Sequence, residues 1–156
     1  TQNDDVEEAL ESIASASASL LVIVSRSLES ALGAISLPQF RLLVILARSR
    51  WTPIAQLAPL AGASSQAIEE MIHSMENDGW ISLAGADTTS DPAVGVTVHG
   101  RQLVKHVTTR RRADIAAVLE RMSEPDRRKV ADAFGRFASA AGEPGTGELQ
   151  LIDTSS

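Results

Sequence analysis

The chain has 156 residues, a formal net charge of −6, 44% hydrophobic residues and no cysteine. This length favours a single domain that can bury a sizeable core. The absence of thiols excludes disulfides, thiolate metal ligands and cysteine-based redox sensing. Aromatic residues make up only 3% of the chain, so aliphatic side chains must fill the core, which suits packed helices.

The first third of the sequence predicts two helices. From residue 5 to residue 32, apolar residues recur at steps of mostly three and four, which is the spacing of one helix face. A second helix is expected from Pro38 to about Arg48. The longest uninterrupted apolar run, Leu42–Ala47, is too short to span a membrane, and the acidic first residues do not form a signal peptide. We therefore expect a soluble cytoplasmic protein that does not contact membranes.

The middle of the chain predicts two more helices. Thr52 is expected to cap a short helix with Pro53 at its first position. Ser64 is expected to cap a longer helix that ends near Asp78, with Gly79 in the left-handed region behind it.

A β-hairpin and two further helices are expected to follow. Residues 80–83 and 94–98 have the alternating pattern of strands, and residues 84–93 between them are rich in turn formers. A long helix is expected from His99 or Gly100 to Arg121, followed by a last helix that ends near Ala141. The remaining residues, 142–156, are expected to be disordered.

The charge distribution is uneven. Between Trp51 and Gly100 the chain has six carboxylates and no Lys or Arg. The preceding 50 residues carry four cations and six anions, and residues 101–156 carry ten and eight, so neither flank forms a strongly basic tail.

Three stretches resemble the MarR family of winged helix-turn-helix regulators: Leu37–Leu43, Ile54–Gly79 and Val96–Leu103. Their order and spacing extend the resemblance over about residues 10–140. It implies a mainly α fold with a small β-hairpin wing (α+β). Residues 1–36 and 100–141 would form dimerisation helices, and residues 37–99 the winged helix-turn-helix.

Proteins of this family are typically homodimers that bind double-stranded DNA, and many respond to a small aromatic or phenolic acid. The resemblance implies a set of DNA-facing residues, namely Ser64, Ser65, Gln66, Glu69, Glu70, His73, Thr88, Thr89 and Ser90. Glu70 stands where relatives usually carry Arg, and the expected wing tip, 87–91, has no cation. Because phosphate contacts depend on cations, these departures predict weakened or lost DNA binding.

Candidate phosphate contacts outside this region are Arg48, Arg50 and Arg101. The candidates for a ligand pocket are Trp51, His99 and His106, near the hinge between the dimerisation helices and the winged helix-turn-helix. Packing or surface roles are the simpler interpretation of these residues.

The acidic face of the helix after Ser64 contains a Glu-x-x-His pattern, but a metal site of this kind needs a second, facing motif. A solvated face is therefore preferred, and no metal site, cofactor or enzymatic activity is predicted. Three functions remain open: a regulator scaffold with impaired DNA contact, an ordinary ligand-responsive repressor, and a scaffold recruited to bind or convert a small molecule.

Overall fold

The computed structural model describes residues 2–85 and 91–141. Its helices are α1 (Gln2–Leu32), α2 (Leu37–Leu46), the 3-10 helix η1 (Ile54–Gln56), α3 (Leu57–Ala61), α4 (Ser65–Asn77), α5 (Val98–Glu120) and α6 (Glu124–Ala141). Its strands are β1 (Thr52–Pro53), β2 (Ile81–Ala84) and β3 (Ala93–Val96). The expected mainly α fold with a small β-hairpin is confirmed. The predicted disordered tail, residues 142–156, lies outside the described residues.

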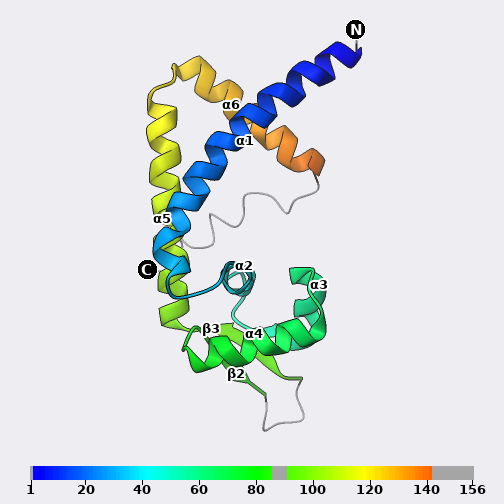
Figure 1. Cartoon of the computed structure of the whole chain (residues 1–156), viewed down its shortest axis with the longest axis vertical. Coiled ribbons are helices and arrows are strands. Elements are labelled where there is room, and N and C mark those ends of the chain that lie inside the picture. The colour runs from blue at the N-terminus through cyan, green and yellow to red at the C-terminus, as the bar shows by residue number, and fades with distance from the viewer. Residues whose placement is uncertain (1, 86–90, 142–156) are drawn as a thin grey trace.

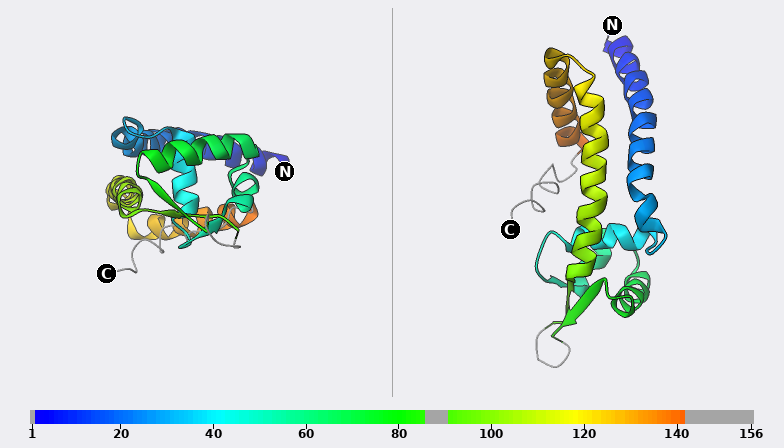
Figure 2. Two further views of the ribbon diagram at one scale, coloured as in Figure 1. Left: turned by 90° about the horizontal axis from the view of Figure 1, so that it is seen from below. Right: turned by 90° about the vertical axis from the view of Figure 1, so that its left-hand side faces the viewer.

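Two long helices form the upper part of the molecule. α1 and α5 run side by side, and α6 turns back at the far end of α5 (Figures 1 and 2). The other helices and the sheet form a compact unit at the opposite end (Figure 1). We refer to α1 and α5 as the arms. We refer to the compact unit, which consists of α2, η1, α3, α4 and the sheet, as the winged unit.

The sheet has three antiparallel strands in the order β1-β3-β2. Thr52 pairs with Val94, so the prediction that Thr52 caps a helix is wrong. Pro53 lacks an N–H donor and is tolerated because β1 is an edge strand. The prediction of Val98 as a strand residue is wrong. Val98 is the first residue of α5, because Thr97 caps that helix, and its side chain is 75% exposed. The Gly100 N–H donates to Thr97 Oγ1 over 3.1 Å.

One core cluster connects the arms to the winged unit. It contains residues from the end of α1, from α2 and α4, from the hairpin and from the first turns of α5, including Leu28, Leu43, Ile72, Val94 and Val104. Each of these side chains is less than 9% exposed. The core thus lies at the corner where the arms enter the winged unit.

The outer parts of α1 and α6 leave apolar side chains exposed. Val6, Leu10 and Leu21 are more than half exposed. By length and composition alone, an 18-residue window within Asn3–Leu32, with a mean hydropathy of 1.4, would be able to cross a membrane. The expectation of no spanning segment rested on uninterrupted apolar runs, whereas this helix has polar residues between its apolar ones. None of the window is buried within the described residues, and a single helix of this kind is weak evidence for a membrane span.

Candidate nucleic-acid interface

The candidate nucleic-acid interface is centred on α4. The predicted cap of this helix, Ser64, is confirmed. The Ala67 N–H donates to Ser64 Oγ over 3.2 Å, and the backbone of Ser64 is extended. Ile68, Ile72 and Met75 are buried at helical spacing, and this fixes the orientation of the helix. At its C-terminal end Gly79 has a φ of 77°, in the left-handed region that favours glycine.

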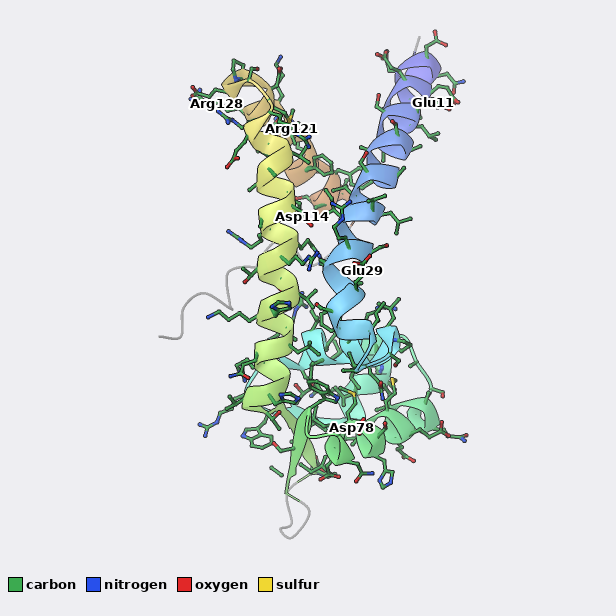
Figure 3. All side chains as sticks on the ribbon, turned by 60° about the vertical axis from the view of Figure 1, so that its left-hand side comes forward. Glu11, Glu29, Asp78, Asp114, Arg121 and Arg128 are labelled. Carbon is green, nitrogen blue, oxygen red and sulfur yellow. The ribbon has the colours of Figure 1, made fainter. Side chains whose placement is uncertain are left out.

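The outward face of α4 is acidic. Its exposed side chains are Ser65, Gln66, Glu69, Glu70, His73, Glu76 and Asn77. Asp78 follows at the C-terminal cap and is also exposed (Figure 3). The sequence of α4 and its cap contains four carboxylates and no Lys or Arg. In a helix-turn-helix this surface would meet the major groove.

Two hydrogen bonds organise this face. The Gln66 side-chain amide donates to Glu70 Oε1 over 3.1 Å. His73 Nε2 lies 3.3 Å from Asn77 Nδ2. The first bond uses one of the two amide hydrogens of Gln66, so the side chain keeps a second N–H donor and a carbonyl acceptor.

The expected cationic contacts lie outside α4. Arg48 and Arg50 are exposed in the segment after α2, and Arg101 is exposed in the first turn of α5. The candidate wing-tip residues Thr88, Thr89 and Ser90 lie outside the described residues.

The candidate ligand residues have separate environments. The His99 ring stacks on Trp80, and the ring of Trp51 lies over Gly95 of β3, where a Cβ would be 2.9 Å from it. His106 is exposed farther along α5. The contact of His99 with Trp80 was not predicted, because no local spacing links the two residues. Within residues 2–85 and 91–141, no cluster of three or more His, Asp or Glu side chains is arranged to hold a metal ion.

A second surface lies between α1 and α6. Two shallow grooves of about 620 and 350 Å³ have almost entirely apolar walls. Ile13 and Phe137 line both grooves, and Phe134 lines the smaller one. Both Phe side chains are about half exposed, at 48% for Phe134 and 54% for Phe137. Apolar patches of this kind usually mark contact surfaces.

Comparisons with known proteins identify relatives with the same architecture. A model of the MarR family matches residues 35–82. RV1404 from Mycobacterium tuberculosis is 30% identical, with a TM-score of 0.80 and coverage of 86% of this chain and 92% of that one. The MarR family protein RV2887 from the same organism is also 30% identical, with a TM-score of 0.55 and coverage of 81% and 90%.

A more distant match is a mutant of MepR from S. aureus bound to an oligodeoxyribonucleotide. It is 15% identical, with a TM-score of 0.63 and coverage of 85% of this chain and 97% of that one, and it shows the shared fold alone. No curated protein sequence matches the chain.

Proposed function

Since the chain belongs to the MarR family of winged helix-turn-helix transcriptional regulators, we propose that it is a homodimeric cytoplasmic regulator whose direct contact with DNA is weakened. Residues 1–36 and 100–141 would form the dimerisation part, and residues 37–99 the DNA-facing part. The observation that carries this proposal is the acidic outward face of α4.

The weakening follows from electrostatics. Glu69 and Glu70 are exposed in the N-terminal half of α4, which would lie nearest to the bases and to the phosphates on either side. A phosphate contact made by Lys or Arg contributes about 0.9 to the salt slope of log K. A carboxylate in the same place contributes repulsion. Because a dimer would present this face twice, the loss of DNA-binding free energy per dimer would be doubled.

Residual DNA contact would use groups that need no cation on α4. The N-terminus of α4, capped by Ser64, can hold one phosphate through backbone N–H groups. Glu70 can accept a hydrogen bond from cytosine N4, and Gln66 can contact adenine. Arg48, Arg50 and Arg101 would supply the remaining phosphate contacts.

The homodimer is supported by the apolar grooves between α1 and α6. Phe137 and Ile13 contribute to both grooves and are exposed in the single chain. Covering such side chains yields about 25 cal/mol for each Å² removed from water. A second copy of the arms would bury them.

Ligand responsiveness, with a small aromatic or phenolic acid between the arms and the winged unit, is proposed from family membership. The stack of His99 on Trp80 marks the junction that such a ligand would disturb. An ordinary ligand-responsive repressor is the second candidate, and it is favoured by the exposed Arg48, Arg50 and Arg101, which can contact phosphates without a cation on α4. Recruitment of the scaffold to bind or convert a small molecule ranks below both.

The test is a titration with genomic DNA fragments at about 50 and 200 mM salt. The parent chain, Glu70→Arg and Glu70→Gln would be compared. Glu29→Arg provides the matched control, since it makes the same charge change on α1, far from α4 (Figure 3). We expect weak binding by the parent and tighter binding by Glu70→Arg, with a salt slope steeper by about 0.9 for each new phosphate contact. Glu29→Arg should change neither.

Tight parental binding with a steep salt slope would support the ordinary repressor and refute the weakened contact. Equal gains from Glu70→Arg and Glu29→Arg would show that net charge, and not the face of α4, limits binding.

A further inference from the structure

Gln39 links the corner between α1 and α2 to the C-terminal half of α4. Its side-chain Oε1 accepts the Ser36 N–H over 2.9 Å, and its own N–H donates to Ser36 Oγ over 3.4 Å. Its Nε2 donates to Ser74 Oγ over 3.2 Å. One side chain therefore completes the capping box of α2 and also reaches a helix 35 residues farther along the chain.

The orientation of this amide is determined by its partners. The Ser36 N–H is a donor and requires the carbonyl oxygen of the amide. The amide nitrogen must then point away from the cap, toward Ser74. Both Gln39 and Ser74 are partly buried, so water competes less for this bond than at an open surface.

The other end of the corner is tied to α1. The Ile35 N–H donates to the Ala31 carbonyl oxygen over 3.0 Å, and Ile35 is only 4% exposed. Backbone and side-chain hydrogen bonds thus run from the last turns of α1 through Ser36 and Gln39 to Ser74. Ser74 directly follows His73, which is on the outward face of α4.

α2 and α4 also share the apolar core, which includes Phe40 of α2 and Ile72 of α4. Burial of apolar surface is itself a non-directional contribution. A hydrogen bond favours angles above about 150° and weakens steeply below about 120°. The amide of Gln39 therefore adds a directional restraint to the packing of the core.

We propose that Gln39 is a positioning residue that fixes the orientation of α4 relative to α1. The bond from Gln39 to Ser74 carries this role, and the capping bonds to Ser36 only hold the amide in place. The proposal concerns a relationship within one chain and does not depend on DNA binding.

Spin-label distances can test the proposal, because the chain has no native cysteine. Labels would be placed at Glu29→Cys on α1 and His73→Cys on α4, both exposed positions. The labelled full-length chain would be mixed with an excess of unlabelled chain carrying the same test substitution, so that only distances within one chain contribute. Ser74→Ala removes the bond to α4 and leaves the capping box intact. Ser36→Ala is the matched control, because it removes the capping hydroxyl but keeps the N–H that orients the amide.

We expect Ser74→Ala to broaden and shift the distance distribution, and Ser74→Thr, which keeps a hydroxyl, to restore the parental one. Ser36→Ala should lower the thermal midpoint without changing the distribution. An unchanged distribution in Ser74→Ala would overturn the proposal. Equal broadening in Ser36→Ala would also overturn it, since the effect would then come from general loss of stability. Circular dichroism of each variant confirms that the fold is retained.

Discussion

The indole ring of Trp80 and the imidazole ring of His99 lie nearly parallel, with their centroids 4.2 Å apart and their planes inclined by 11°. Trp80 directly precedes β2, and His99 is the second residue of α5. The stack therefore joins the start of the hairpin to the first turn of α5. Trp80 is 6% exposed, whereas His99 is exposed and covers its ring from the solvent side.

Replacement of His99 by Ala should destabilise this junction. Loss of an aromatic pair lowers the free energy of unfolding by about 1 kcal/mol. Urea denaturation in a Trp51→Phe background would follow Trp80 alone, because the chain has only two Trp. His106→Ala removes another exposed imidazole from the same helix, one that does not stack on Trp80, and should have little effect as the control. Equal losses from both variants would show that the stack makes no specific contribution.

Gly100 should not tolerate Ala. A Cβ at this position would lie 2.3 Å from the carbonyl oxygen of Trp80, which is backbone and cannot rotate away. Overpacking of this kind costs about 1–3 kcal/mol or more. Thermal denaturation should show a clear loss for Gly100→Ala. Gly33→Ala has no heavy atom within 4 Å of the added Cβ and should remain close to the parent.

Loss of the α4 cap should cost about 1 kcal/mol in Ser64→Ala, because the Ala67 N–H loses its acceptor. Ser65→Ala changes the neighbouring exposed residue, which is already within the helix, and is the matched control. Urea midpoints of the two variants give the comparison. A cap effect would be refuted if both variants unfolded at the parental midpoint.

Acid should selectively weaken the start of α6. The hydrogen bond from Ser123, followed by the contact with Lys129, lowers the pKa of Asp126 below its ordinary value of 3.8. The ionised carboxylate therefore stabilises the fold above that value, and the stabilisation is lost as the pH falls through the folded-state pKa. Thermal midpoints of the parent and Asp126→Asn should differ at pH 7 and converge in acid. Ser123→Ala should reduce the difference at pH 7.

Phe137→Glu should dissociate the proposed homodimer, because a carboxylate would enter the apolar grooves between α1 and α6. Sedimentation equilibrium would measure the change as a shift from dimer to monomer. Val98→Glu alters a more exposed apolar residue at the start of α5 and should leave the dimer intact. A parental chain that sediments as a monomer would contradict the dimer itself.

The helices could be predicted because their signals are local. Ser64 before α4 and Gly79 behind it are end signals, and the buried residues between them have helical spacing. The capping box of Ser36 and Gln39 also has a local signal, a Ser followed three residues later by Gln, and so it is predictable from the sequence.

The third strand could not be predicted in the same way. β1 has only two residues, too few to show alternation, and Thr-Pro is also a good start for a helix. Only the pairing of Thr52 with Val94, 42 positions away, makes it a strand. The partners of Gln39 and Trp80 were missed for the same reason, since they are contacts between segments distant in sequence. The outward acidic face of α4 was predicted, because helix periodicity alone determines it.

The close approach at Gly100 also has a mechanical consequence. Where α5 leaves the winged unit, its backbone rests against the main chain of Trp80 without an intervening layer of side chains that could deform. A tilt of α5 would therefore move the hairpin strands β2 and β3 with it.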